Sequence, residues 1–441
     1  MYVARALPEY TRASGWVDLL PPRRPQDALS GHVTADVAVI GAGFAGLAAA
    51  RTLQDQDPAL RIVLLEASEI ALGAAGRNSG FVIDLPHEVS SEDYAGGQAS
   101  DTRRQIHLNR SAIALIARIA AENGCGRDVF DPCGKYNIAM GSKGDHHITA
   151  YARQLDALGE PYRLLDAKAI AEVTGTDRFS SAIHMPGTAI IQPAAWVRLA
   201  ADSLGPGVRL HERTPVTAFA RQGGAWQLTT PAGRITAPRV ILATNGHAQS
   251  FGLYAGQLLH VFTYASMSEP FAPARLGGHR SWAATPAFPM GTTVRRVQGT
   301  DGDRLLIRSR YTYHARPKIG EADVARAGRV HDRKFAARFP MLLGLRMAHR
   351  WGGAMALTWN GVPTVGEIEP GLFSACTCNG VGATKATAAG IAAAQQALGL
   401  DTELVDTFRR AAPPRALPPQ PWLTLGARLN LRWREWRAGI E

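Results

Sequence analysis

The stretch from Asp36 to Ser68 constrains the fold more than any other part of the chain. A short apolar, β-branched run over residues 37–40 predicts a buried strand, and a glycine turn follows it directly. The turn has the spacing G-x-G-x-x-G, with Gly41, Gly43 and Gly46. The first glycine permits the tight turn, the second lets the backbone approach a pyrophosphate, and the third lets a helix pack on the strand.

The residues after the turn complete a β-α-β unit. A helix rich in alanine and leucine is predicted over residues 44–54, and a second strand over residues 61–65. Glu66 follows, at the position where a carboxylate can bind a ribose 2′-hydroxyl. The unit therefore predicts an adenine dinucleotide site, with NAD and FAD both open and NADP disfavoured by the acid. A glycine turn that packs a helix on a strand without any ligand is the alternative.

The length and composition narrow the class of protein. The 441 residues can form two or more domains, and no apolar run is long enough to predict a transmembrane helix. The N-terminal stretch lacks the apolar core of a signal peptide, so we expect a cytoplasmic protein. The four cysteines and the pair His146–His147 lack the spacing of a disulfide framework or a metal site. The net charge of +11 comes without a basic run interleaved with aromatic residues, so nucleic acid is an unlikely partner.

Signals for further strands and helices are spread along the chain. Helices are predicted over residues 101–123, 193–204 and 321–338, and strands over 208–211, 216–219, 226–229, 239–242, 257–267, 294–297 and 304–311. A strand, a glycine turn and a helix of small residues are predicted within residues 371–399. The pattern indicates an α/β protein, α+β overall. It would have a discontinuous Rossmann-like FAD/NAD(P)-binding domain and an inserted antiparallel-sheet substrate domain.

The domain boundaries that we expect are as follows. Residues 1–30 form an N-terminal surface segment; 31–90, 191–255 and 346–412 form the three parts of the cofactor domain; 91–190 is a helical and substrate-domain segment; 256–345 is the substrate-domain sheet; and 413–441 is a basic C-terminal tail.

Six segments, taken in order, resemble motifs of the FAD-dependent D-amino acid oxidase / glycine oxidase superfamily. They are DVAVIGAGFAGLAAA, EASEIALGAAGRNSGFV, IQPAAWVRLAADSL, VILATNGH, RWGGAMALTWNGVPTVGEI and CNGVGATKATAAG. The likeness extends over nearly the whole chain and is nearest to bacterial amine oxidases of the gamma-glutamylputrescine oxidase type. It implies FAD as the cofactor, held non-covalently because Met355 stands where some members carry a flavin-linking cysteine. The single G-x-G-x-x-G agrees, because no second site for NAD(P)H is visible.

The resemblance also implies which residues contact the flavin. They are Gly41, Gly43, Phe44, Ala45, Gly46, Glu66, Ala67, Ser68, Ala75, Gly76, Arg77, Asn78, Ser79, Gly80, Val216, Thr244, Gly380, Val381, Gly382, Ala383 and Thr384. A surface ion pair is the alternative for Arg77, and an ordinary buried strand position is the alternative for Val216. Gly80 and Thr384 stand where relatives that bind a small carboxylate carry an arginine and a lysine. Glycine and sarcosine are therefore not the expected substrates.

No catalytic residue is identified from the sequence. Candidates for the wall of the substrate pocket are His260, Tyr264, Arg308, Tyr311, Tyr313, His314, Trp351 and Trp359, each with a core position as the alternative. Cys376 and Cys378 are predicted to point to one face of a strand as small buried side chains.

The resemblance implies an FAD-dependent amine oxidase or dehydrogenase. The substrate would be gamma-glutamylputrescine-like or another N-substituted amine. Hydride would pass to flavin N5, the imine would hydrolyse to an aldehyde, and O2 or another acceptor would take the electrons, O2 giving hydrogen peroxide. The alternatives are an FAD-dependent enzyme that modifies a tRNA nucleoside, a non-catalytic FAD-fold subunit, and an NAD-linked dehydrogenase. The oligomeric state is not predicted, and the basic tail is expected to pack on the protein rather than meet a lipid surface.

Overall fold

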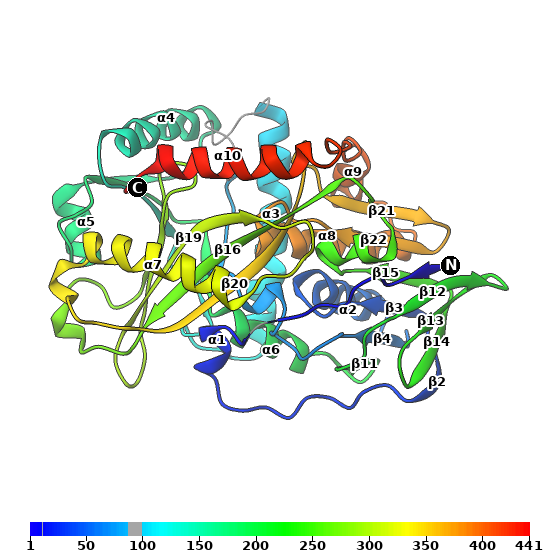
Figure 1. Ribbon diagram of the computed structural model, residues 1–441. Coiled ribbons are helices and arrows are strands. Elements are labelled where there is room, and N and C mark those ends of the chain that lie inside the picture. Colours follow the sequence, from blue (N-terminus) through cyan, green and yellow to red (C-terminus); the bar gives the residue numbers. More distant parts are fainter. Residues whose placement is uncertain (11, 87–98) are drawn as a thin grey trace.

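The computed structural model describes residues 1–10, 12–86 and 99–441, which form a mixed α/β fold (Figure 1). Two large sheets organise it: a six-stranded sheet beside the glycine turn and an eight-stranded sheet formed from later segments. No helix of the described residues is long and apolar enough to cross a membrane.

The six-stranded sheet contains the β-α-β unit and has the strand order β11-β4-β3-β15-β22-β21. Its strands are β3 (Val37–Ile40), β4 (Ile62–Leu65), β11 (Val208–His211), β15 (Arg239–Leu242), β21 (Thr364–Glu369) and β22 (Leu372–Cys376). All neighbours run parallel except β21 and β22. The carboxyl ends of β3, β4, β15 and β22 therefore meet at one edge, where parallel α/β sheets bind their ligands.

Both faces of this sheet are covered, which is why its strands are continuous apolar runs. Val37 and Val39 pack towards the helices α2 (Phe44–Gln56), α3 (Ala99–Glu122), α6 (Pro193–Asp202) and α8 (Gly382–Ala397). Ala38 and Ile40 pack towards a five-stranded sheet. That sheet has the order β1 (Tyr2–Val3), β12 (Ala218–Gln222), β13 (Ala225–Thr229), β14 (Gly233–Ala237) and β2 (Gly31–Thr34).

The eight-stranded sheet supplies the other wall of the cavity described below. In spatial order it contains β20 (Met347–Thr358), β16 (Leu258–Ser268), β19 (Arg304–Tyr313), β18 (Thr293–Val297), β17 (Trp282–Pro286), β7 (Lys135–Ala139), β9 (Ser181–Met185) and β8 (Arg163–Asp166). Its pairs are antiparallel except β7 and β17, so the predicted antiparallel sheet is in fact mixed. A small sheet of β5 (Phe81–Val82), β10 (Ala189–Ile191) and β6 (Phe130–Asp131) completes the strands.

The remaining helices lie on the two large sheets and their connections. They are α1 (Gly15–Asp18), α4 (Ser142–Leu158), α5 (Ala167–Thr174), α7 (Glu321–Arg338), α9 (Glu403–Arg409) and α10 (Trp422–Ala438), with short 3-10 turns at η1 (Ala74–Gly76), η2 (Asn245–Phe251), η3 (Pro273–Arg275) and η4 (Pro340–Leu342). Helix α10 runs along the outer edge of the molecule, at the top of Figure 1.

Several predicted elements have the observed bounds, including the strands at 37–40, 208–211 and 239–242 and the helix at 321–338. The strand predicted at 216–219 begins at Ala218 instead, because residues 214–216 leave the sheet and line the cavity. Strand β20 joins the eight-stranded sheet although it lies within the segment assigned to the third part of the cofactor domain. The boundary expected between residues 90 and 91 lies outside the described residues, and the domain division stays a prediction.

We expected the N-terminal segment to lie on the surface, but part of it is buried. Trp16 is fully buried, and its ring contacts that of Trp351 with a centroid distance of 6.4 Å. The tail does pack on the protein, as expected: α10 buries Ala438 against Val261 and Tyr311.

Candidate active site

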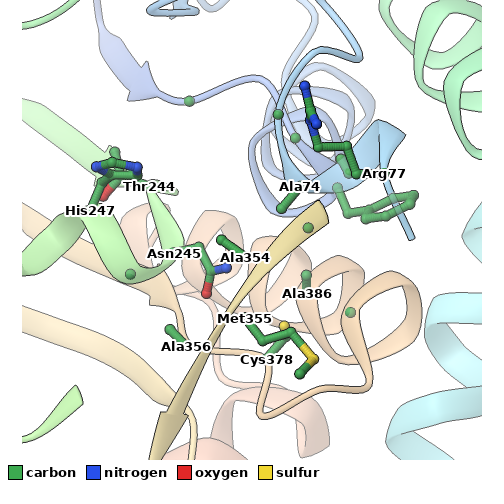
Figure 2. Close-up of a pocket in the computed structure, with 18 of the residues that line it drawn as sticks. Ala74, Arg77, Thr244, Asn245, His247, Ala354, Met355, Ala356, Cys378 and Ala386 are labelled. Atoms are coloured by element: carbon green, nitrogen blue, oxygen red, sulfur yellow. The ribbon is translucent and has the colours of Figure 1, made fainter. Parts of the chain in front are cut away.

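One large cavity lies between the two main sheets, at the carboxyl ends of the parallel strands. It encloses about 2490 Å³ of space, its open mouth included. Figure 2 shows side chains from separate segments around it: the loop after β4, the turn after β15, strand β20 and the start of α8. The topology thus brings the three predicted parts of the cofactor domain to one place.

The glycine turn forms one end of the cavity, and its geometry requires glycine. Gly41 has φ +101°, which L side chains rarely adopt. A Cβ built on Gly46 would lie 1.7 Å from the carbonyl oxygen of Gly41, so α2 packs directly on the turn. Gly43 differs, because its Cβ would meet only the Cβ of Ala75, at 3.5 Å. Gly46 therefore lets α2 pack on the turn but lies outside the cavity lining, while Gly43 is part of the lining.

Glu66 lies at the end of β4 and lines the cavity. Its Oε2 accepts a hydrogen bond of 3.1 Å from the amide of Ala42, and its Oε1 accepts one of 3.0 Å from Ser68. Burial raises the pKa of this carboxyl, and the two amide hydrogen bonds oppose that rise. The residue is positioned by the glycine turn to receive a hydroxyl from a ligand in the cavity.

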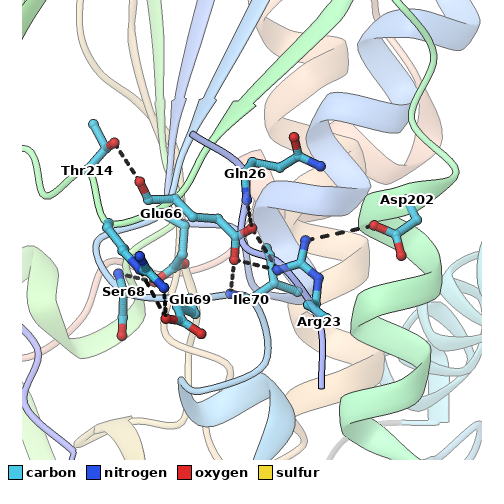
Figure 3. Close-up of polar contacts among 10 residues, drawn as sticks. Arg23, Gln26, Glu66, Ser68, Glu69, Ile70, Asp202 and Thr214 are labelled. Carbon is cyan, nitrogen blue, oxygen red and sulfur yellow. Dashed lines mark hydrogen bonds and ion pairs between the residues drawn. The ribbon is translucent and has the colours of Figure 1, made fainter. Parts of the chain in front are cut away.

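A buried carboxylate, Glu212, fixes the loop that follows Glu66. It accepts hydrogen bonds from Arg23 Nη1 at 2.7 Å, the amide of Gln26 at 2.7 Å and the amide of Ile70 at 2.6 Å. Figure 3 shows Arg23, Gln26 and Ile70 around this contact, with Glu66 beside them. The N-terminal segment therefore braces the end of the cavity beside Glu66, which the sequence pattern did not indicate.

The loop of residues 75–80 is held from several sides. Arg77 is 5% exposed, and its guanidinium donates to the carbonyls of Leu72, Gly352 and Arg12. The alternative of a surface ion pair for Arg77 is therefore wrong. Burial lowers the pKa of this arginine, whose guanidinium also lies over the Tyr10 ring at 4.8 Å.

Two tryptophans and a second arginine complete the brace. Trp16 Nε1 donates to the carbonyl of Asn78 at 2.8 Å, and Trp351 Nε1 donates to that of Arg77 at 2.9 Å. Arg295 Nη1 donates to Ser79 at 3.2 Å, and burial lowers the pKa of Arg295 to about 10. Trp16 and Arg295 were missed, and Trp351 had been assigned to the substrate wall, because only the tertiary fold brings these side chains to the loop.

The turn before α8 forms the facing wall. Residues 380–383 line the cavity, but Thr384 is fully buried behind it and Lys385 lines the cavity instead. The prediction that Cys376 and Cys378 point to one face of a strand is wrong. Strand β22 ends at Cys376, and Thr377 turns the backbone with φ +63°. Cys376 donates to the carbonyl of Leu242 at 3.2 Å, and burial raises the pKa of both thiols.

Most of the predicted cofactor residues line the cavity. Those that do are Gly41, Gly43, Phe44, Ala45, Glu66, Ala67, Ala75, Arg77, Asn78, Ser79, Val216, Thr244, Gly380, Val381, Gly382 and Ala383. Gly46, Ser68, Gly76, Gly80 and Thr384 lie outside the lining. Gly76 and Gly80 act like Gly46, because a Cβ on either would meet a backbone oxygen within 2.1 Å.

The end of the cavity against the eight-stranded sheet contains His260, Tyr264 and Arg308 from the predicted substrate wall. Burial lowers the pKa of His260, whose Nε2 contacts Gln249 Oε1 at 2.7 Å. His247 also lines the cavity, and burial lowers its pKa to about 4. Both imidazoles are therefore neutral near pH 7.

The other predicted wall residues lie elsewhere. Tyr311 packs against α10, and Tyr313 Oη accepts a hydrogen bond of 3.1 Å from Gln420. His314 contacts the ring of Phe262, and Trp351 lies behind the loop of residues 75–80. Trp359 is 62% exposed, because it lies in the turn after β20 rather than on the strand.

The lining fits an adenine dinucleotide that carries a flavin. The N-termini of α2 and α8 both meet the cavity, and no described side chain caps either of them. Free amides at a helix start bind anionic oxygens, so residues 43–45 would hold a pyrophosphate. Glu66 would hold the ribose, and residues 77–79 and 380–383 would border the flat ring system. Asn245 Oδ1 and His247 Nδ1 are buried beside the cavity without a partner among the described atoms.

Comparisons with known proteins agree with this geometry. The model of the family "FAD dependent oxidoreductase" matches residues 36–396. A probable oxidoreductase OrdL of Rhizobium meliloti is 26% identical over 88% of this chain and 89% of its own length. Gamma-glutamylputrescine oxidoreductase of Escherichia coli is 27% identical over 87% of this chain and 88% of its own. The crystal structure of glycine oxidase from Geobacillus kaustophilus superposes with a TM-score of 0.68 at 20% identity. It covers 84% of this chain and 96% of that one.

Proposed function

The chain belongs to the FAD dependent oxidoreductase family, and from that premise we propose that it oxidises the carbon–nitrogen bond of an amine that also carries a carboxylate. FAD is its cofactor. The observation that supports the substrate class is the charge at the substrate end of the cavity, where Arg308 is the cationic side chain from the sheet.

FAD, when bound, accepts the hydride that leaves the carbon next to the amine nitrogen. We propose that the cofactor is held non-covalently, because Met355 lines the cavity at the position of the linking cysteine of some relatives. The uncapped start of α8 points towards the cavity, where its amides stabilise negative charge on the ring system.

Arg308 supports a substrate that is anionic at one end. Arg308 of β19 lines the cavity, and its guanidinium donates to Oη of Tyr311, a residue outside the lining. No described carboxylate forms an ion pair with Arg308. Among the described lining residues the acids are Glu9, Glu66 and Glu69, which come from the N-terminal segment and the loop at the end of β4. A guanidinium without an acidic partner favours a carboxylate group over a simple diamine.

The same charge pattern favours a neutral amine. The imidazoles of His247 and His260 are neutral, so they provide no negative charge that would stabilise a protonated amine. A neutral amine has the lone pair that helps hydride to leave the adjacent carbon. The chain thus assists the reaction through the protonation state of its substrate.

Apolar side chains close this end of the cavity. Phe262, Tyr264, Ile319 and Met355 line it and exclude water from the reacting carbon. The imine then hydrolyses after release. A primary amine such as gamma-glutamylputrescine gives an aldehyde and ammonia, and an N-substituted amine gives an aldehyde and an amine. We propose O2 as the acceptor, with hydrogen peroxide as its product.

The similarity to gamma-glutamylputrescine oxidoreductase supports a gamma-glutamyl amine as the substrate, because such a molecule joins an amine to a carboxylate.

The test is steady-state oxidation of gamma-glutamylputrescine and of putrescine by the wild type and by Arg308→Met. We expect kcat/KM for gamma-glutamylputrescine to fall about tenfold to a hundredfold, the loss of one charged hydrogen bond. The value for putrescine should not fall. Arg329→Met, which removes an exposed arginine from α7, is the matched control. If Arg308→Met changed kcat/KM by the same factor for both amines, the assignment of Arg308 would be wrong. A flavin that no amine reduces would instead favour the tRNA-modifying or non-catalytic alternatives.

A further inference from the structure

Helix α10 exposes an apolar stripe that the proposed reaction does not use. The stripe consists of Trp422, Leu425, Leu429, Trp433, Trp436 and, just after the helix, Ile440. These six side chains are between 48% and 77% exposed. They include three of the four tryptophans that are exposed among the described residues. Such a concentration of large apolar side chains on one element marks an interaction surface.

The stripe faces away from the protein. Its members are spaced three or four residues apart, which places them along one side of a helix. The opposite side holds Leu431 and Ala438, which pack on the eight-stranded sheet. Glu435 anchors that side, because its carboxylate accepts from the amide of Tyr311 and pairs with Arg310. The helix is therefore fixed to the fold through one face and presents the stripe on the other.

Positive charge borders the stripe. Arg428 and Arg432 are exposed on α10, and Arg437 lies over the ring of Trp433 at 4.8 Å. Lys143 of α4 donates to the carbonyl of Arg437 at 3.2 Å, so its ammonium adds to the same border. The one acidic residue of α10 is Glu435, which is already paired with Arg310. The surface therefore combines tryptophan and leucine with basic side chains.

We propose that the α10 stripe docks this protein on the surface of an anionic lipid bilayer. Tryptophan prefers the boundary between headgroups and acyl chains, and leucine side chains gain from entering it. Basic residues beside the stripe are attracted to anionic headgroups. The helix would lie in the plane of the bilayer surface, with its packed face and the catalytic domains on the aqueous side.

The charges argue against a second copy of the chain as the partner. Two stripes that met face to face would bring Arg428 and Arg432 of each copy towards the arginines of the other. No exposed acid on α10 could neutralise them. An anionic bilayer supplies the opposite charge, so it complements both parts of the surface.

The test is flotation of the full-length, FAD-loaded protein with lipid vesicles. We expect binding to vesicles of phosphatidylcholine and phosphatidylglycerol, and about tenfold or more weaker binding to phosphatidylcholine alone. The double variant Trp433→Ser/Trp436→Ser should lose binding by about tenfold or more. Arg428→Gln/Arg432→Gln should lose about thirtyfold on anionic vesicles and little on neutral ones.

Matched controls separate the stripe from general stickiness and charge. Leu164→Ser/Leu343→Ser removes two other exposed leucines, and Arg209→Gln/Arg221→Gln removes two exposed arginines from β11 and β12. Both controls should bind like the wild type, and all variants should keep their FAD content because the altered residues lie outside the cavity. Absence of binding to anionic vesicles would overturn the proposal, as would equal losses in the controls. A dimer that Trp433→Ser/Trp436→Ser makes monomeric, without vesicle binding, would assign the stripe to self-association instead.

Discussion

Substituting alanine for Gly43 separates cofactor binding from folding. Gly43 lines the cavity, and a Cβ there would have the Cβ of Ala75, at 3.5 Å, as its nearest neighbour. That distance is an ordinary van der Waals contact, so the protein without FAD should accept the methyl group. The remaining space around the new Cβ is the cavity, where the backbone must approach the pyrophosphate. Gly43→Ala should therefore weaken FAD binding while leaving the fold intact.

The magnitude follows from the contacts that the methyl group displaces. Hydrogen bonds to a charged group contribute about 1.5–3 kcal/mol each. Losing one such bond from the start of α2 should raise the Kd for FAD about tenfold to more than a hundredfold. The assay is titration of FAD into apoprotein, followed by the fluorescence of the flavin, together with thermal unfolding of the apoprotein.

Two other glycines calibrate the result. Gly46→Ala places its Cβ 1.7 Å from the carbonyl oxygen of Gly41, so it should destabilise the apoprotein as well as abolish FAD binding. Gly426→Ala lies on α10 with nothing within 4 Å of its Cβ and should leave the Kd for FAD unchanged. The reasoning is refuted if Gly43→Ala binds FAD as tightly as the wild type, or if it lowers the Tm of the apoprotein as much as Gly46→Ala does.

Two buried titratable groups give predictions of pH dependence. Burial lowers the pKa of Lys135 to about 7. Between about pH 7 and 10.5 the unfolded chain therefore holds one more proton than the folded protein. The free energy of unfolding then rises with pH, by up to about 1.4 kcal/mol per pH unit. Urea unfolding of Lys135→Met should therefore show an advantage over the wild type that shrinks from pH 7 to pH 9. Exposed Lys168→Met should show no such trend, and a constant difference for Lys135→Met would contradict a lowered pKa. Burial lowers the pKa of His331 to about 3, so its contribution is complete above pH 6.5 and is lost as the pH falls towards 3. His331→Gln should unfold with a flatter acid limb than the wild type, and an unchanged slope between pH 6 and 4 would count against this account.

The chemistry of His331 follows from its hydrogen bonds. Its Nε2 lies 3.3 Å from the carbonyl oxygen of Ser309, which can only accept, so Nε2 carries the proton. Its Nδ1 then accepts from Ser266 Oγ at 2.7 Å. The positive charges of Arg350 and Lys334 disfavour a positive charge on His331. Protonation would reverse the hydrogen bond with Ser266 and place a cation in a buried site, which is why acid should destabilise this part of the fold.

The parts of the site that could be predicted from the sequence are those set by local spacing. The glycine turn, β4 and Glu66 lie within one β-α-β unit, where steric limits on Gly41 and Gly46 fix the geometry. The start of α8 was predicted for the same reason. Which of two adjacent residues lines the cavity could not be predicted. The local path of the backbone places Lys385, and not Thr384, in the lining.

Contacts between distant segments could not be predicted in this way. Trp16 and Arg295 hold the loop of residues 75–80 from segments that the sequence pattern does not connect with it. Tyr311 and Tyr313 were correctly placed on a strand, yet neither lines the cavity. Tyr311 packs against α10 and Tyr313 bonds Gln420, while Arg310, just before them, adopts φ +67°. The sequence shows that residues 413–441 are basic and aromatic. Which of these side chains stay exposed depends on the face of α10 that packs on the sheet, and only the structure shows that face.

The central claim is that the cavity binds FAD and that an amine in the same cavity reduces it. The most direct measurement is the visible spectrum of the purified protein without oxygen, before and after addition of gamma-glutamylputrescine, putrescine, sarcosine and D-alanine. We predict a flavin spectrum whose main band bleaches with gamma-glutamylputrescine and returns when air is admitted. A protein that binds no FAD even when FAD is supplied, or a bound flavin that none of these amines bleaches, would contradict the account.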